Sequence, residues 1–442
     1  LLGNRDCVDY RGKVNFVNRL NLKFSEYACE HKNLHIVDIN YISSSYGLSK
    51  WSDPFYYYMY KYCLAVPAIP VLSFNVANIV KAIYGKNKKG LVLDLDNTLW
   101  GGVIGDDGVE GISLGQDTSD GQAYQDFHRY LKSLAKIGIT LSVCSKNDEK
   151  NALLGLNHPD SILKKDDFVQ IKANWNNKDL NFKEIANDIN VSADSLVFVD
   201  DNPSERDLVT SQIPGVVAPN IEDVTSYIST IDRSGFFENI SLSEDDLKRN
   251  EMYKSNRQRA NLKSQFKNYG EYLDSLEMKA QIKPFEPLYF ERISQLTNKS
   301  NQFNLTTLRL TENEIEKISN NKRYLTFYGK LTDKFGDNGI VSLVIGEILD
   351  DVLHIRLWLM SCRVLKRDFE LAMLDRLIEA AITMKLSCII GYYFRTEKNR
   401  MVSEFYGTHG FKKISEDDKG NTVWKYEINT PYQKSNQHIC VE

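Results

Sequence analysis

The sequence predicts an α/β protein whose core is a parallel sheet. Three short apolar runs, at residues 91–93, 139–144 and 196–199, support this class. Unbroken apolar runs of this length are typical of strands that are buried on both faces of a parallel sheet. Between the first two runs, apolar residues recur at helical spacing and Gly138 follows as a C-cap. This alternation of strand and helix favours a doubly wound sheet.

Polar residues follow each of the three apolar runs, at the edge where parallel sheets bind their ligands. Asp94 and Asp96 follow the first run, and residues i and i+2 of a strand point to the same side. Ser145 follows the second run, and Asp200 and Asp201 follow the third. Neighbouring carboxylates repel each other, so their grouping indicates a site that holds a cation or moves phosphate.

Residues 94–98 resemble the first motif, DxDxT, of the haloacid dehalogenase (HAD) superfamily of phosphotransferases. The resemblance implies that Asp94 is the nucleophile that forms an aspartyl-phosphate and that Asp96 is the general acid and base. Ser145 would bind the phosphoryl oxygens, and Lys178 would neutralise the charge around nucleophile and phosphate. Two nearby lysines remain alternatives to Lys178: Lys172 and Lys183.

The same resemblance implies a magnesium site. Asp94, Asp96, Asp200 and Asp201 would hold Mg²⁺, a hard cation that prefers oxygen ligands. Taken without the other motifs, Asp200 and Asp201 are equally suited to capping a helix that opens at 203–206.

The residues that flank these acids resemble those of the FkbH-like family, in which a HAD module is joined to a GNAT-like acyltransferase domain. The resemblance extends over most of residues 91–411 and is carried by 94–102, 144–148, 174–178, 198–206, 301–307, 335–339 and 358–365. It implies a glyceryl transferase and phosphatase. Such an enzyme takes the three-carbon acyl unit of 1,3-bisphosphoglycerate, removes phosphate, and delivers a glyceryl thioester to the phosphopantetheine arm of an acyl carrier protein.

We expect five segments along the chain, and we divide them by their pattern and by the family resemblance. They are a partial SGNH-like segment at 1–89, a HAD-like domain at 90–232, a helical connector at 233–277, a GNAT-like α+β domain at 278–430 and a C-terminal tail at 431–442. The connector should begin at 243–246, where the residues suit a helix N-terminus, and its basic residues should form a solvated face.

The first segment is the least informative. Residues 34–39 fit a parallel strand, and 51–54 resemble the end of an SGNH-hydrolase-like domain. The segment has no serine-nucleophile block, so we expect no hydrolase activity there. The aromatic run at 55–58 is expected to pack against other residues.

The GNAT-like domain is indicated by a strand at 352–359 and by a helix that carries Phe369 and Leu377. In that fold, the turn before the helix offers backbone N–H groups to a pyrophosphate. Here Lys366 and Asp368 stand where glycines are usual, and side chains there hinder the close approach of a ligand to the backbone. A phosphopantetheine arm, or a vestigial pocket, is therefore expected in place of intact coenzyme A.

A glyceryl transferase needs a group that holds the acyl unit, and a cysteine thiolate is suited to this role. We choose Cys362, at the end of the GNAT-like strand, where Arg363 would favour the thiolate. Cys144, beside Ser145, is the alternative, although strand alternation directs its side chain to the opposite face.

The composition excludes several classes of function. The 442 residues include 59 acidic and 55 basic side chains, a balance that predicts neither nucleic-acid nor membrane binding. We see no apolar run near the ~18 residues of a membrane span. Seven scattered cysteines favour a reducing, cytoplasmic location. The rival functions are a phosphomonoesterase whose C-terminal domain only recognises substrate, and a non-catalytic scaffold for carrier proteins.

Overall fold

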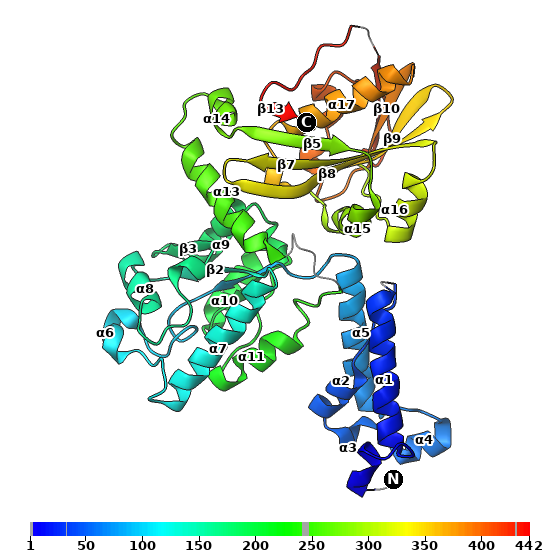
Figure 1. The fold of residues 1–442 in the computed structure, drawn as a ribbon. Helices are drawn as coiled ribbons and strands as arrows, with labels where there is room; N and C mark the ends of the chain where they lie inside the picture. Colours follow the sequence, from blue (N-terminus) through cyan, green and yellow to red (C-terminus); the bar gives the residue numbers. More distant parts are fainter. Residues whose placement is uncertain (1–2, 32, 241–246, 429–430) are drawn as a thin grey trace. The chain divides into compact units, whose positions relative to one another are not determined.

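The computed structural model describes residues 3–31, 33–240, 247–428 and 431–442 (Figure 1). The chain divides into two compact units. The helical unit comprises the chain up to Ile83 and a short segment from Glu238, and the main unit comprises Tyr84–Phe237 and the remainder. Each unit is described here by itself.

The described part of the helical unit contains helices and no strand. They are α1 (Lys13–Glu30), α2 (Ile39–Tyr46), α3 (Leu48–Trp51), α4 (Pro54–Tyr60) and α5 (Ile69–Ile83). The prediction of a strand at residues 34–39 is therefore wrong. Asp38 instead caps α2 by accepting a hydrogen bond from the Tyr41 N–H at 2.9 Å.

The helical unit leaves many apolar side chains in solvent. Phe55 is 62% exposed and Tyr58 75% exposed, so the packing predicted for the aromatic run is wrong for both. The segment Val66–Ile83, which includes α5, has 18 residues and a mean hydropathy of 1.5. By length and composition it is apolar enough to cross a membrane, and the expectation that no segment reaches this size is wrong.

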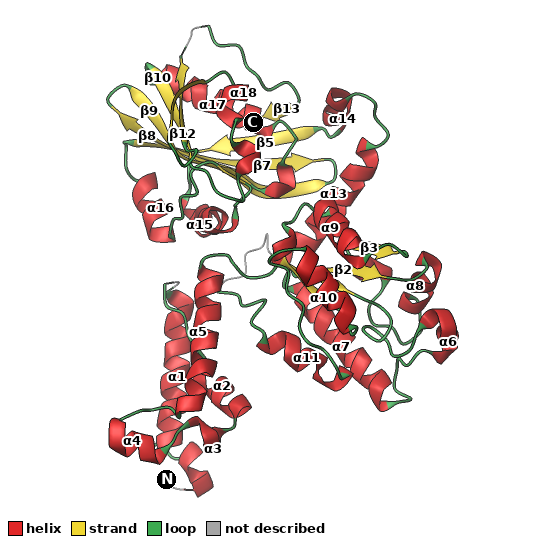
Figure 2. Cartoon of the chain, turned by 180° about the vertical axis from the view of Figure 1, so that it is seen from behind, coloured by secondary structure: helices red, strands yellow, loops and turns green. Residues whose placement is uncertain are grey.

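The main unit begins with a four-stranded parallel sheet in the order β3-β2-β1-β4. Figure 2 shows two of these strands, β2 and β3, among the helices of this part of the chain. Its strands are β1 (Gly90–Leu93), β2 (Thr140–Ser145), β3 (Gln170–Ala173) and β4 (Leu196–Val199). The helices of this parallel-sheet lobe are α6 (Ile104–Gly111), α7 (Ser119–Lys136), α8 (Glu149–Leu156), α9 (Lys178–Asp188), α10 (Pro203–Gln212) and α11 (Val224–Arg233). The predicted class and all three predicted strands are confirmed.

Alternate residues of β1 pack into different cores, because helices cover both faces of the sheet. Leu91 and Leu93 pack with Phe127 of α7 and Tyr227 of α11. Val92, between them, lies in a second core with side chains of α9 and α10. Burial on both faces explains why the strands are apolar at every position.

The strands of this lobe end in register. Leu93 pairs with Val143 of β2 and with Val199 of β4. The residues that follow, Asp94 after β1 and Asp200 after β4, therefore leave the sheet at the same edge, close to the end of β2.

The second sheet of the main unit has nine strands and defines the mixed-sheet lobe. Their order is β11-β12-β10-β9-β8-β7-β5-β13, and β6 pairs with β9. The strands are β5 (Met278–Lys283), β6 (Phe303–Asn304), β7 (Tyr324–Asp333), β8 (Gly336–Leu349), β9 (Val352–Met360), β10 (Cys388–Tyr393), β11 (Lys412–Glu416), β12 (Thr422–Glu427) and β13 (Ile439–Val441). Among them are helices α15 (Phe290–Lys299), α16 (Glu312–Ser319), α17 (Phe369–Thr383) and α18 (Phe405–Thr408).

Most of this sheet is antiparallel, but β10 pairs with β9 and β13 with β5 in parallel. The predicted strand and helix are confirmed as β9 and α17, and both Phe369 and Leu377 are buried. The segment expected as a tail contributes β13 to the edge of the sheet.

Helix α13 (Arg249–Lys263) connects the two lobes, and α14 (Tyr269–Ser275) follows it. In its first turn, Arg249 donates to the Gly138 carbonyl of the parallel-sheet lobe at 3.0 Å. Near its end, Arg259 donates to both carboxylate oxygens of Asp333, at 2.8 and 2.7 Å, and Arg367 pairs with the same group at 3.1 Å. Arg259 is 3% exposed, so the predicted solvated basic face is wrong at this residue. The helix start predicted at 243–246 lies outside the described residues.

Candidate active site

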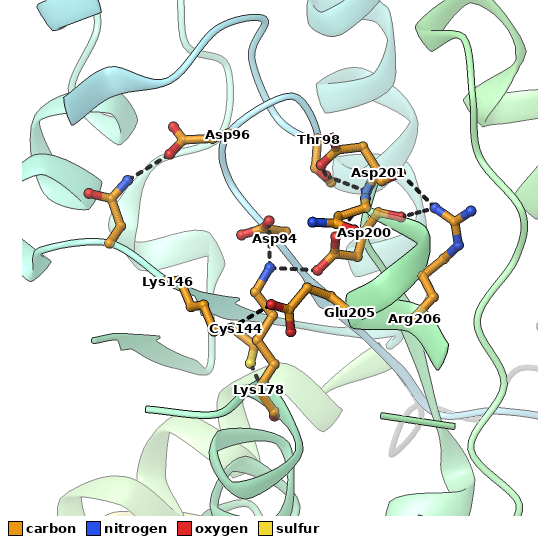
Figure 3. Close-up of polar contacts among 12 residues, drawn as sticks. Asp94, Asp96, Thr98, Cys144, Lys146, Lys178, Asp200, Asp201, Glu205 and Arg206 are labelled. Atoms are coloured by element: carbon orange, nitrogen blue, oxygen red, sulfur yellow. Dashed lines mark hydrogen bonds and ion pairs between the residues drawn. The ribbon is translucent and has the colours of Figure 1, made fainter. Parts of the chain in front are cut away.

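A buried ion-pair network lies where the parallel strands end (Figure 3). Lys178, the first residue of α9, donates to Asp94 Oδ2 at 2.7 Å and to Asp200 Oδ2 at 2.6 Å. All three side chains are nearly excluded from solvent. Burial by itself lowers the pKa of Lys178, but Asp94 and Asp200 more than offset this, and the net pKa is raised. Lys178 is therefore a permanent cation between two carboxylates.

Three carboxylates of this site are placed to share a cation. One oxygen from each of Asp94, Asp200 and Asp201 lies within 4.8 Å of the others. Asp94 Oδ1 is buried and has no hydrogen-bond partner among the described residues. Burial, together with the charge of Asp94, raises the pKa of Asp200 to about 6, and the same causes raise the pKa of Asp201. An oxygen-rich, crowded acidic group of this kind fits a hard divalent cation.

The Asp96 carboxylate points away from this group (Figure 3). Its Oδ1 accepts hydrogen bonds from Trp100 Nε1 at 2.9 Å and from the Ile104 N–H at 3.1 Å, and its Oδ2 accepts one from Asn147 Nδ2 at 3.0 Å. Burial raises its pKa, although these hydrogen bonds oppose the shift. The expectation that the Asp96 carboxylate belongs to the metal ligands is corrected, because its three donors hold it elsewhere.

Several residues that support the site had no role in the sequence prediction. Asn147 positions Asp96, as described above. Arg206 Nη1 donates to the backbone carbonyls of Asp200 and Asp201, both at 2.8 Å, and so fixes the turn that carries these acids. Lys146 pairs with Glu205 at 2.6 Å. The sequence signal for these residues is that they lie in the segments 144–148 and 198–206, which carry the family resemblance and follow the strands β2 and β4.

The other predicted phosphate-site residues are placed as follows. Ser145 is the last residue of β2, is 1% exposed and lies at the same edge as Asp94. The two alternatives to Lys178 are engaged elsewhere. Lys172 pairs with Glu184 at 2.9 Å, and Lys183 pairs with Asp179 of its own helix at 3.1 Å. Of the three lysines, Lys178 is the one whose side chain is shown in contact with Asp94 and Asp200.

The two candidate thiols differ in their surroundings. Cys144 is fully buried among the side chains under α9, donates to the Lys178 carbonyl at 3.6 Å, and has a pKa raised by burial. It is therefore a poor nucleophile. Cys362 is partly exposed and lines a cavity beside Lys89 and Ser195, which precede β1 and β4. Cys362 thus lies at the amino end of the parallel sheet, whereas Asp94 lies at the carboxyl end.

Solved structures are similar to parts of this chain, whereas the other comparisons found no match. None of the family models matches this sequence, and no curated protein matches it. A solved structure of the N-terminal part of the protein BF1531 from Bacteroides fragilis, containing a phosphatase domain complexed with Mg, is 36% identical with a TM-score of 0.53. The similarity covers 55% of this chain and 65% of that chain. This chain therefore spans slightly less than two thirds of that solved structure.

Acetyltransferases are also among the similar structures. The ribosomal-protein-S18-alanine N-acetyltransferase of Escherichia coli is 12% identical with a TM-score of 0.27, over 36% of this chain and 99% of that chain. Ard1 from Thermoplasma volcanium is 14% identical with a TM-score of 0.26, over 34% of this chain and 98% of that chain.

Proposed function

We propose that the protein is a Mg²⁺-dependent HAD-type phosphatase that also transfers an acyl group. Its substrate is a phosphorylated three-carbon acyl donor of the 1,3-bisphosphoglycerate kind, and the glyceryl unit passes through a thioester on Cys362 to the phosphopantetheine arm of an acyl carrier protein. The observation that carries the phosphatase half is the contact of Lys178 with both Asp94 and Asp200 beside Asp201.

The residues at the carboxyl end of the sheet can perform phosphate hydrolysis in two steps. Asp94 attacks phosphorus with its unpartnered Oδ1, so that an O–P bond forms while the bond to the leaving oxygen breaks. Asp96 gives its proton to the leaving oxygen. A water molecule then attacks the aspartyl-phosphate, Asp96 takes the proton of this water, and inorganic phosphate leaves. Lys178 holds Asp94 in place throughout.

A magnesium ion held by Asp94, Asp200 and Asp201 would neutralise charge on the phosphoryl oxygens, as positioning and charge neutralisation are the main demands of phosphoryl transfer. The geometry of the three acids fits this ion, and the similar phosphatase domain from Bacteroides fragilis is complexed with Mg.

The acyl-transfer half is supported by the family resemblance and by the setting of Cys362. This thiol is partly exposed and lines a cavity, as an acyl acceptor must. All seven cysteines are free thiols, which supports a reducing, cytoplasmic location. The partial SGNH-like relationship of the first segment remains a prediction.

The test is intact-mass spectrometry of the protein incubated with 1,3-bisphosphoglycerate and Mg²⁺, with and without a carrier protein. We expect a glyceryl adduct that Cys362→Ala removes while phosphate release continues. Asp94→Asn should abolish the release of phosphate from a generic phosphomonoester. Phosphate release without any adduct would instead establish a phosphomonoesterase. If neither phosphate release nor an adduct is detected, the remaining candidate function is a non-catalytic scaffold for carrier proteins.

A further inference from the structure

The chain turns sharply directly after β1, next to the two acids of the proposed reaction. The N–H groups of Thr98 and Leu99 both donate to the Leu95 carbonyl, at 3.1 and 2.7 Å. Asn97, inside this turn, has a φ of 53°, in the left-handed region. Asparagine adopts this region more readily than most residues, but a turn of this kind persists only where other contacts hold it.

Two buried tyrosines from different helices hold the backbone of Asn97. Tyr227 of α11 donates to the Asn97 carbonyl at 2.9 Å, and Tyr124 of α7 donates to the same oxygen at 3.2 Å. Their rings meet edge to face, with centroids 6.4 Å apart. The two hydroxyl groups therefore use both lone pairs of one carbonyl oxygen, which fixes the direction of that peptide group.

A histidine holds the same turn two residues further along the chain. His128 Nε2 is 2.8 Å from the Leu99 carbonyl, and because a carbonyl only accepts, this nitrogen carries the proton and donates. His128 lies four residues after Tyr124 on α7, so both side chains leave the same face of that helix. We call Tyr124, His128 and Tyr227 the support cluster.

The support cluster keeps its donors at neutral pH. Burial raises the pKa of Tyr227 to about 12 and also raises the pKa of Tyr124, so both hydroxyl groups stay protonated. Burial lowers the pKa of His128, so the ring is neutral and has its proton on Nε2. The three hydrogen bonds to the turn therefore do not change with pH in this range.

The turn determines where the general acid of the proposed reaction lies. Asp96 directly precedes Asn97, and its carboxylate points away from Asp94 and the other acids of the metal site (Figure 3). In-line phosphoryl transfer places the leaving oxygen on the side of phosphorus opposite to the attacking oxygen. An acid that protonates the leaving oxygen must therefore lie apart from the nucleophile, and the turn at Asn97 gives Asp96 this separate place.

We infer that Tyr124, His128 and Tyr227 are positioning residues that direct Asp96 towards the leaving oxygen of the substrate. They act through the backbone carbonyls of Asn97 and Leu99 and not on the reacting atoms themselves. This inference deepens the proposed function, since it rests on Asp96 as the general acid. It predicts that loss of a tyrosine hydroxyl weakens proton transfer to the leaving group more than it weakens the attack on phosphorus.

Two phosphate esters of similar shape separate these effects. The phenolate released from phenyl phosphate is more basic than the nitrophenolate released from p-nitrophenyl phosphate, so it depends more on a proton from the general acid. For both esters, kcat/KM reports the steps up to the transfer of the phosphoryl group to Asp94. The ratio of kcat/KM for phenyl phosphate to that for p-nitrophenyl phosphate therefore measures how well Asp96 is placed.

The experiment measures this ratio for the whole protein with Mg²⁺, by the release of inorganic phosphate. Tyr227→Phe removes one hydroxyl and keeps the ring, and it should lower the ratio about threefold. Tyr124→Phe should lower it less, because its hydrogen bond is the longer one. The double variant leaves the Asn97 carbonyl without either hydroxyl and should lower the ratio about tenfold.

Two further variants make the result specific. Asn147→Ala removes a direct donor to Asp96 and should change the ratio in the same direction. Tyr406→Phe removes the hydroxyl of an equally buried tyrosine in the mixed-sheet lobe and should leave the ratio unchanged. The Mg²⁺ concentration for half-maximal rate should stay at the wild-type value in both single tyrosine variants, and urea unfolding checks that each variant is folded.

An unchanged ratio in the double variant, whether or not both rates fall, would overturn the inference. The tyrosines would then support only the stability of the lobe. A raised requirement for Mg²⁺ with an unchanged ratio would also overturn it, because the support cluster would then act on the metal-binding acids.

The failure of this inference can be distinguished from the failure of the proposed function. If the wild type hydrolyses neither ester, or if Asp94→Asn hydrolyses both at the wild-type rate, the proposed phosphatase fails and this inference fails with it. If Asp94→Asn is inactive and Asn147→Ala lowers the ratio while the double tyrosine variant does not, the proposed phosphatase stands and only the role of the support cluster fails.

Discussion

Replacement of Lys178 by methionine tests the ion-pair network on which the phosphatase site depends. The side chain is 3% exposed and makes contacts of 2.7 and 2.6 Å with Asp94 and Asp200. Methionine keeps the volume but leaves two buried carboxylates without their cation. Removing one partner of a buried pair costs about 3–5 kcal/mol. We therefore expect Lys178→Met to lower the free energy of unfolding by about this amount in chelator.

The assay is urea unfolding in EDTA, followed by the fluorescence of the buried Trp100 in the same lobe. Adding Mg²⁺ should restore part of the loss, because a cation among the carboxylates replaces the missing charge. Lys172→Met is the matched control, since that lysine is 23% exposed in its pair with Glu184 and should contribute at most about 1 kcal/mol. An equally small decrease in the free energy of unfolding in Lys178→Met and Lys172→Met would refute the importance of the buried ion-pair network for stability.

Two further predictions concern buried polar groups of the same lobe. Asn147→Ala removes one of the three hydrogen-bond donors that hold Asp96. It should lower kcat for p-nitrophenyl phosphate about 10–100-fold with little change in KM. An unchanged kcat would exclude a role of Asn147 in positioning Asp96. Burial lowers the pKa of His128 to about 4, so this side chain is neutral in the folded protein while the unfolded chain takes up a proton below about pH 6.5. Stability should therefore fall from pH 6.5 towards pH 4, by about 2 kcal/mol at pH 5 from this residue. In urea titrations, the free energy of unfolding should decrease less between pH 7.5 and pH 5 in His128→Gln than in the wild type. An identical decrease in both proteins would contradict the lowered pKa of His128.

The parallel sheet and most of the acidic site were predictable from sequence because both follow from local pattern. An apolar strand that is buried on both faces is visible as an unbroken run, and parallel strands place the residues after them at one edge. That rule brings Asp94 and Asp200 together without any knowledge of the helices. Lys178 was less certain, since only the fold distinguishes it from Lys172.

Other features depend on contacts that are distant in sequence. The i, i+2 rule places Asp96 beside Asp94 only while the chain remains a strand, and β1 ends at Leu93. Three donors then turn the Asp96 carboxylate away. The position of Cys362 at the opposite end of the parallel sheet depends on how the two lobes meet, which no local pattern records. Residues 34–39 have the composition of a strand, but the described part of their unit offers no sheet for them to join.

The double contact of Arg259 with Asp333 has a consequence for dissecting the protein. These residues are 74 positions apart, and the Asp333 carboxylate is completely enclosed. A deletion in α13 that removes Arg259 would leave this buried acid with Arg367 as its remaining cationic partner, beside the Phe335 N–H, at a point distant in sequence from the deletion. Expression of the mixed-sheet lobe from Met278 onward should accordingly yield an unstable product. A fragment that begins before Arg249 retains the ion pair between Arg259 and Asp333.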